Sequence, residues 1–127
     1  MQISLVTAGI LGLLLILLGV RVSAVRRSAG VSMGDGGNAL LLERMRAQAN
    51  FAEHAPLGLL LIFLMEQTYG SGPFTLALAI ALVAGRILHP IGMARPAPNA
   101  PRVGGMVLTW TPIGIAAIAL LVAGLTR

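Results

Sequence analysis

Residues 46–65 read RAQANFAEHAPLGLLLIFLM, a polar segment that continues directly into an apolar one. Arg46, Asn50 and Glu53 are spaced at i, i+4 and i+7, so they share one face of a helix. The apolar half is typical of a membrane-embedded helix. Ionisable groups at membrane depth are costly and usually mark a functional site. The stretch therefore predicts a membrane helix with a functional polar face.

The composition of the whole chain is that of an integral membrane protein. Hydrophobic residues make up 57% of the 127 residues and charged residues only 10%. This is too little charge to cover the surface of a small soluble domain. Residues 3–20 carry no charge and are numerous enough to cross a bilayer. We therefore expect an all-α integral membrane protein that forms one domain over residues 1–127.

Four segments are predicted membrane helices, and the connections between them are short. The Gly-rich stretch 30–38, the turn at 69–73 and the Pro-rich stretch 94–101 cannot continue a helix. Short connections between consecutive helices favour an antiparallel four-helix transmembrane bundle. The predicted helices cover about residues 2–22, 39–67, 74–94 and 103–125.

Basic residues set the expected orientation. Nine arginines and four acids give a net charge of +5, and the arginines gather at the ends of predicted helices. The positive-inside rule and anionic lipid explain this pattern, so no nucleic-acid partner is expected. The first and third loops are the basic ones, which predicts that they are cytoplasmic and that both termini lie outside.

Two side-chain types limit the chemistry. The chain has no cysteine, which excludes disulfides and a thiolate nucleophile of its own. His54 and His89 fall on different predicted helices with one acid nearby, and this pattern does not predict a metal site.

The polar face of the second predicted helix has two interpretations. In one, Arg46 pairs with Glu43 or Glu53 and Asn50 bridges them, which makes a self-neutralising packing network. In the other, Arg46 holds a carboxylate of a zwitterionic ligand and Glu53 holds its ammonium group, while Asn50 and Gln48 bind amides. The two interpretations are compatible.

Other basic residues add to the candidate site. Arg86 and His89 are neighbours at i and i+3 on the third predicted helix; Arg86 either snorkels to the surface or faces a ligand. A guanidinium beside a thiol favours the thiolate, which is the reactive species. The arginines at cytosolic helix ends, which flank the membrane and could also serve a soluble thiol, are Arg26, Arg27, Arg95 and Arg102.

At these residues the chain resembles the MAPEG family, the membrane-associated proteins in eicosanoid and glutathione metabolism. The resemblance rests on Arg46–Asn50 (RAQAN), Glu53, His54 and Pro56, and on the stretch Ala84–Met93 (AGRILHPIGM). It implies a bacterial inner-membrane protein that forms a homotrimer of four-helix subunits in the lipid bilayer. Glutathione would be the co-substrate, bound between neighbouring subunits near the cytosolic face.

The resemblance also assigns roles to residues. Arg102, helped by Arg27, would stabilise the thiolate of glutathione. His54, His89 and Met93 stand where the eicosanoid enzymes of the family have tyrosines, so contacts made there by hydroxyl groups are altered. The residues that would hold the polar groups of glutathione are Arg26, Arg46, Gln48, Asn50, Glu53, His54, Arg86 and His89.

The leading hypothesis is therefore a glutathione-dependent transferase or peroxidase that acts on lipophilic electrophiles. The altered tyrosine positions leave open a second class, a non-catalytic lipid- or glutathione-binding scaffold of the same fold. A third class is the small four-helix multidrug exporters, which the chain resembles in size. These carry a membrane-embedded glutamate in the first span, whereas residues 2–22 contain no acid.

Overall fold

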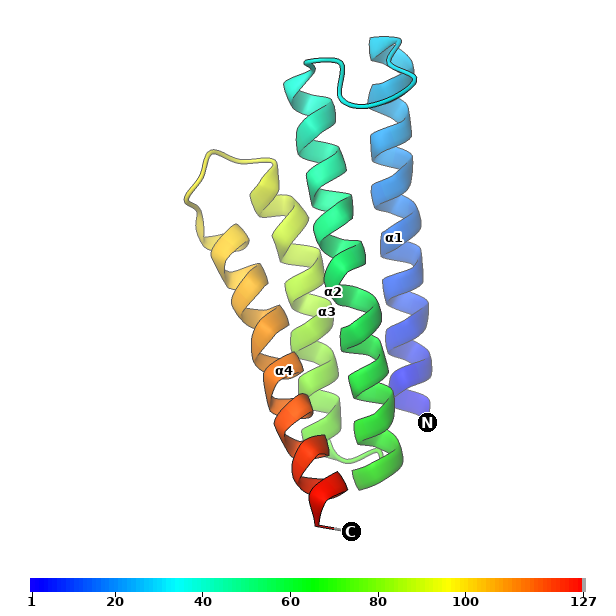
Figure 1. Ribbon diagram of the computed structural model, residues 1–127, viewed down its shortest axis with the longest axis vertical. Coiled ribbons are helices and arrows are strands. Elements are labelled where there is room, and N and C mark those ends of the chain that lie inside the picture. Colours follow the sequence, from blue (N-terminus) through cyan, green and yellow to red (C-terminus); the bar gives the residue numbers. More distant parts are fainter. Residues whose placement is uncertain (127) are drawn as a thin grey trace.

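The computed structural model describes residues 1–126, which form four long helices joined by short connections (Figure 1). Consecutive helices run antiparallel, so the first and third connections lie at one end of the bundle (Figure 1). The N-terminus and the second connection lie at the other end. This confirms the predicted all-helical fold. The helices are α1 (Gln2–Ala29), α2 (Ala39–Tyr69), α3 (Pro73–Met93) and α4 (Ala100–Leu125).

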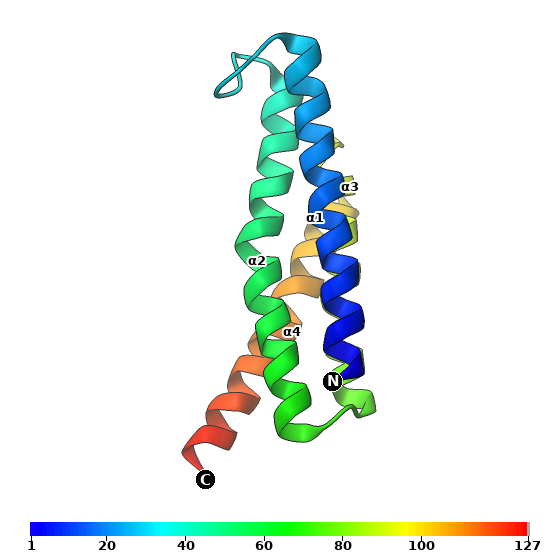
Figure 2. The ribbon, with the colours of Figure 1, turned by 90° about the vertical axis from the view of Figure 1, so that its right-hand side faces the viewer.

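Three of the four helices, α1, α3 and α4, are long and apolar enough to cross a membrane. The polar residues in the first half of α2 lower its hydropathy, although this helix has 31 residues and runs alongside α1 (Figure 2). Large apolar side chains such as Leu13 and Ile16 point outward from α1. Exposed apolar surface of this kind is expected where lipid or another subunit covers it.

The helix ends follow local chemistry, with one correction to the prediction. Asn38 caps α2, because its Oδ1 accepts a hydrogen bond from the Leu41 N–H at 2.9 Å. α1 extends to Ala29 instead of ending near residue 22, so Arg26 and Arg27 form part of its last turn. Positive charge is favourable there because it faces the negative end of the helix dipole.

Glycines let α3 and α4 approach each other closely. A Cβ atom on Gly105 would lie 2.6 Å from the backbone nitrogen of His89, and one on Gly92 would overlap the backbone nitrogen of Arg102. Small residues at helix interfaces in membranes permit such contact between backbones. The last turns of α3 are therefore held firmly against the first turns of α4.

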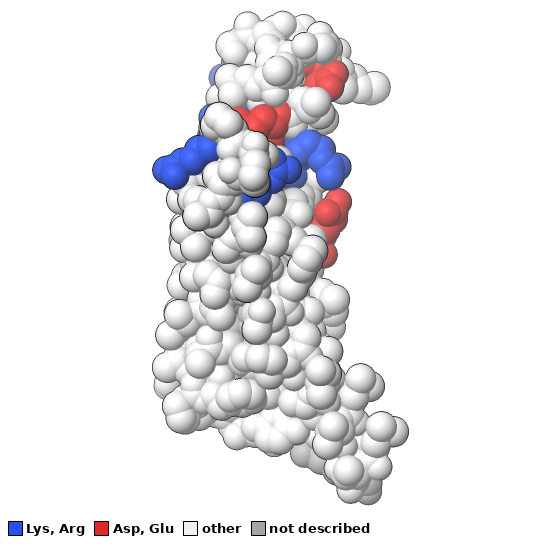
Figure 3. Space-filling view, turned by 90° about the vertical axis from the view of Figure 1, so that its left-hand side faces the viewer, with Lys and Arg blue, Asp and Glu red and all other residues white. Residues whose placement is uncertain are grey.

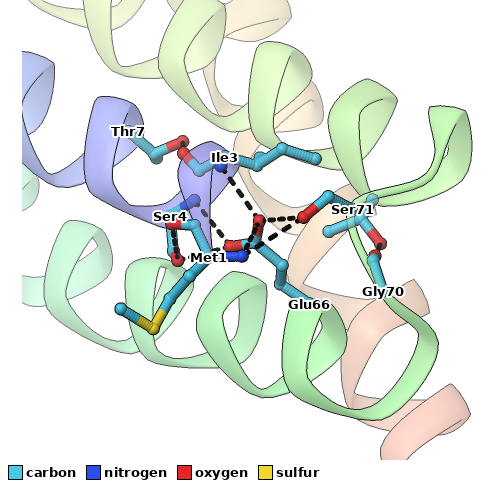
Figure 4. A network of polar contacts seen from close by, with 8 residues as sticks. Met1, Ile3, Ser4, Thr7, Glu66, Gly70 and Ser71 are labelled. Carbon is cyan, nitrogen blue, oxygen red and sulfur yellow. Dashed lines mark hydrogen bonds and ion pairs between the residues drawn. The ribbon is translucent and has the colours of Figure 1, made fainter.

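A buried carboxylate joins α1 to α2 at the end of the bundle that holds the N-terminus, which we call the Glu66 end. Glu66 accepts hydrogen bonds from the Ile3 N–H at 3.0 Å and from the Ser4 N–H at 2.9 Å. The hydroxyls of Ser4 and Ser71 and the amino group of Met1 complete its contacts (Figure 4). Since a carboxylate offers about four lone-pair positions, these donors saturate it.

The outer helices α1 and α4 do not touch. Every other pair of helices is in contact, so α2 and α3 separate α1 from α4, as Figure 1 shows. Groups carried on α1 and groups carried on α4 therefore lie on opposite sides of one subunit.

Candidate functional site

Charged residues concentrate toward the end of the bundle that holds the first and third connections, which we call the Arg86 end. Figure 3 shows blue and red side chains gathered toward this end, while the rest of that face is uncharged. The charged residues of the predicted site lie on α1, α2 and α4, except for Arg86, which lies on α3.

Arg86 lies in the interior, where only 1% of its surface is exposed. Its Nε donates to the Thr109 hydroxyl at 2.8 Å, and its Nη1 donates to the Asn50 side-chain oxygen at 2.9 Å. Its Nη2 faces the Met106 sulfur at 3.7 Å. All of these acceptors are neutral, so the guanidinium bridges α2, α3 and α4 without neutralisation of its charge.

His89, one turn further along α3, shares this environment. It is buried, and its Nδ1 is sealed inside with no hydrogen-bond partner among the described residues. Within residues 1–126, no carboxylate forms an ion pair with Arg86 or His89. A buried cation without a counter-ion is unfavourable at membrane depth. The cluster can therefore gain stability by binding an anion.

His54 uses both of its ring nitrogens, one toward its own helix α2 and the other toward α4. Its Nδ1 lies 2.8 Å from the Asn50 backbone oxygen, and its Nε2 accepts a hydrogen bond from the Trp110 indole N–H at 3.1 Å. A neutral ring that carries its proton on Nδ1 satisfies both contacts. Asn50 therefore contacts both residues: its backbone oxygen lies beside the His54 ring, and its side-chain oxygen accepts from Arg86. The three residues form one hydrogen-bonded unit.

Arg102 lies in the first turn of α4, half buried, at the mouth of an apolar hollow. The hollow has a volume of about 340 Å³, and Val103, Met106 and Trp110 line it with Arg102. Arg102 thus places a guanidinium beside an apolar surface.

The self-neutralising network predicted for the polar face of α2 is wrong. Glu43 pairs with Arg44 at 3.5 Å, not with Arg46, and Asn50 turns inward to α3. Arg46 and Glu53 are exposed on α2 and make no ion pair within residues 1–126. Two opposite charges thus remain available on the surface next to the buried cluster.

Gln48 points toward a different neighbour. It is half buried, and its amide nitrogen would lie 3.2 Å from a Cβ atom on Gly19, so it rests against α1. Gln48 is therefore on the α1 side of α2 and is not joined to Asn50 in one subunit.

The two arginines that end α1 are not part of the Arg86 cluster in one subunit. Arg26 donates to the backbone oxygens of Val31 at 3.3 Å and Gly34 at 2.8 Å, and so closes the first loop. Arg27 is exposed and lines a separate hollow with Arg26 and Ser23. Since α1 does not contact α4, a single subunit does not bring Arg27 beside Arg102.

The sequence interpretation missed two residues of the cluster. Thr109 is fully buried and accepts from Arg86, and Trp110 donates to His54. The available signal was the run Thr109-Trp110-Thr111-Pro112 inside an otherwise apolar helix, because polar groups in a membrane helix usually have partners in the bundle.

Comparisons with known proteins agree with this architecture. The family model described as MAPEG family matches residues 4–122. Two relatives are both described as Inner membrane protein YecN, one from Escherichia coli strain K12 and one from Escherichia coli O6:H1. Each is 29% identical over 120 residues, which cover 94% of this chain and 91% of the relative. No solved structure matches. Since the family model spans nearly the whole chain, this protein is a membrane protein that belongs to the MAPEG family.

Proposed function

We propose that the protein is a membrane-bound glutathione-dependent transferase or peroxidase that conjugates or reduces lipophilic electrophiles. The observation that carries the proposal is the buried cluster of Arg86 and His89, which has no acidic partner within residues 1–126. Glutathione is a soluble anion with two carboxylates, one ammonium group and one thiol. Its binding would supply the counter-charge that the cluster lacks.

The neighbouring charges on α2 match the remaining polar groups of glutathione. Arg46 is exposed and can pair bidentately with a carboxylate, while the exposed Glu53 can hold the ammonium group. Arg86 and His89 lie one layer further in and favour negative charge on the bound ligand. This arrangement would hold the peptide at the edge of the membrane with its thiol free to turn toward α4.

In the proposed reaction Arg102 stabilises the thiolate of glutathione after the thiol proton leaves to solvent. In conjugation, the sulfur electron pair forms a bond to the electrophilic carbon of a lipophilic co-substrate, and the leaving group departs with its bonding pair. In reduction, the thiolate attacks an oxygen of a lipophilic hydroperoxide, the O–O bond breaks and the other oxygen leaves as alcohol or water. The sulfur of a second glutathione then attacks the oxidised sulfur and displaces its oxygen, which gives glutathione disulfide and water. The co-substrate would enter from the bilayer and lie in the apolar hollow beside Arg102.

A complete site requires more than one subunit. Arg27 and Arg102 lie at the same end of the bundle but on helices that do not touch. If α1 of one copy packs beside α2 and α4 of the next, Arg27 of the first copy comes close to Arg102 of the second. Such a contact joins two different surfaces, and repetition of it closes a ring. A homotrimer in the bacterial inner membrane, with the first and third loops in the cytoplasm, is the assembly that we propose.

One observation favours a second candidate, a glutathione- or lipid-binding scaffold without turnover. The ring of His54 is already engaged by Trp110 and Asn50, and Arg26 is engaged by the first loop. Neither group is free to assist chemistry unless these contacts open on binding.

The direct test is calorimetric titration of the detergent-solubilised protein with glutathione. Saturable binding is expected, and Arg46→Ala should weaken it about tenfold or more, because one ion pair with the ligand is lost. Arg44→Ala is the matched control, since Arg44 lies on the same helix as Arg46 but pairs with Glu43 at 3.5 Å. Absence of binding by the unaltered protein would rule out the transferase or peroxidase and the glutathione-binding scaffold, and would leave only a lipid-binding scaffold.

Turnover and mass measurements complete the test. Conjugation of a chlorodinitrobenzene by the glutathione-loaded protein selects the transferase, whereas binding without turnover selects the scaffold. The mass of the protein in detergent, after subtraction of bound detergent, tests the trimer.

A further inference from the structure

We infer that Asn99 is a positioning residue for Arg102. Its carboxamide links the first turn of α4 to the last turn of α3 by hydrogen bonds, and this link fixes where the Arg102 guanidinium meets the thiol. The inference rests on the proposed function, in which Arg102 stabilises the thiolate.

Asn99 uses both ends of its side chain. Its Oδ1 accepts a hydrogen bond from the Arg102 N–H at 2.9 Å, which caps α4. Its Nδ2 donates to the backbone oxygen of Gly92 at 2.9 Å and to that of Pro96 at 3.1 Å. The carbonyl of Gly92 belongs to the last turn of α3, and it also accepts from the Arg95 N–H of the connection at 3.2 Å. One amide group therefore joins the end of α3 directly to the start of α4.

The surrounding backbone leaves little freedom for another arrangement. A Cβ atom on Gly92 would overlap the backbone nitrogen of Arg102, so the two backbones are already in contact. Pro96 and Pro98 restrict the connection between the helices. Because the position of Arg102 is set by these contacts, a small shift of the first turn of α4 moves the guanidinium relative to bound thiol.

Asn38 provides the natural comparison because it caps α2 at the same end of the molecule. Its Oδ1 accepts from the Leu41 N–H at 2.9 Å, which reproduces the cap made by Asn99. Within the described chain, however, its amide nitrogen has no acceptor and ties α2 to no other helix. Asn38 is thus an ordinary helix cap, whereas Asn99 is a cap and a tie between helices.

The test replaces each asparagine with serine. A serine hydroxyl can still cap the helix and brings no charge, but Asn99→Ser loses the donor to Gly92. The pH at which bound glutathione ionises is measured from the ultraviolet absorbance of its thiolate, and kcat and KM are measured in parallel. In Asn99→Ser the bound thiol should ionise at higher pH and kcat should fall about 10- to 100-fold, with little change in KM. Asn38→Ser should behave like the unaltered protein.

The other outcomes are distinguishable. If Asn99→Ser ionises and turns over glutathione normally, the inference is wrong and the proposed function stands. If both serine variants lose activity equally, Asn99 is only a cap and the inference is again wrong. If the unaltered protein binds glutathione but forms no thiolate, the role of Arg102 fails and the inference fails with it. If it binds no glutathione at all, the proposed function itself fails. Asn99→Thr, which also keeps a capping hydroxyl, replaces Asn99→Ser if circular dichroism shows that the serine variant does not fold.

Discussion

Both ends of the bundle bury a charged side chain, but they differ in how far its surroundings compensate the charge. At the Glu66 end, one carboxylate is surrounded by donors from the start of α1, from Ser71 and from the amino group of Met1 (Figure 4). At the Arg86 end, a guanidinium donates to neutral acceptors, and within residues 1–126 neither Arg86 nor His89 has an acidic partner.

This difference distinguishes a structural contact from the proposed binding site. The carboxylate of Glu66 has no hydrogen-bonding capacity left, so its role is to fasten α1 to α2. The Arg86 end keeps an excess of positive charge and an unpartnered His89 nitrogen. Buried polar groups without partners are uncommon in native proteins and require an explanation. A bound anion would provide that explanation.

The largest loss of stability is expected from Glu66→Gln, which disrupts the hydrogen bonds at the Glu66 end. The amide replaces one acceptor oxygen with an NH₂ group, so buried donors of α1 lose their partner. The unfolding midpoint in detergent should fall by about 10 °C. Glu53→Gln is the control, because Glu53 is an exposed acid of the same helix and its loss should barely move the midpoint. Equal shifts in the two variants would show that the Glu66 end is not a structural fastening.

The next largest effect is expected from Gly105→Ala, which tests the packing that builds the Arg86 end. The added methyl group would meet the backbone nitrogen of His89 at 2.6 Å, and overpacking of this kind costs about 1–3 kcal/mol. The adjacent Gly104 has nothing within 4 Å of the equivalent position. Gly104→Ala should therefore stabilise the helix by about 0.5–1 kcal/mol. Equilibrium unfolding in detergent measures both; a similar sign for the two variants would contradict the close approach of α3 and α4.

The sequence predicts the fold well because its decisive signals are local. Apolar runs of membrane-spanning length and Gly- or Pro-rich breaks define the helices within a few residues, except at the end of α1. The end of α1 was misplaced because Arg26 and Arg27 were interpreted as residues beyond the helix. Arginine is a good helix former and is favoured in a last turn, so charge alone did not end the helix.

The candidate site is less predictable because its contacts join different helices. Periodicity placed Arg46, Asn50 and Glu53 on one face, yet it could not show that Asn50 turns inward to Arg86 while the other two stay exposed. The partner of Arg86 on α4, Thr109, lies 23 positions away in sequence. Such pairings depend on the packing of helices, which the glycines of α3 and α4 determine.

A smaller effect is expected from a matched pair of aromatic variants, one at each end. Tyr69 donates to the Ala119 carbonyl at 2.9 Å, and Trp110 donates to His54 at 3.1 Å. Tyr69→Phe and Trp110→Phe should each destabilise the protein by less than about 1 kcal/mol, since each removes one hydrogen bond of an exposed side chain. Only Trp110→Phe should also weaken glutathione binding, because it releases the His54 ring. Calorimetry on both variants tests this; equal affinities would remove His54 from the site.

The smallest change in stability, together with a large change in binding, is expected from Arg86→Met. Methionine has a similar length and suits the apolar interior, and replacement of a buried charge by a hydrophobic side chain is often neutral for stability. The variant leaves the Asn50 oxygen without its donor, which lowers stability, and removal of the buried charge offsets part of this loss. We therefore expect the free energy of unfolding to change by no more than about 1 kcal/mol. Glutathione affinity should fall about tenfold or more, because the cluster no longer carries an uncompensated positive charge. Arg86→Lys keeps the charge but cannot donate to Thr109 and Asn50 in the same geometry, so it should retain part of the affinity. If Arg86→Met instead unfolds as readily as Glu66→Gln, then Arg86 is a structural brace, the two ends are equivalent, and the case for an anion at the Arg86 end is lost.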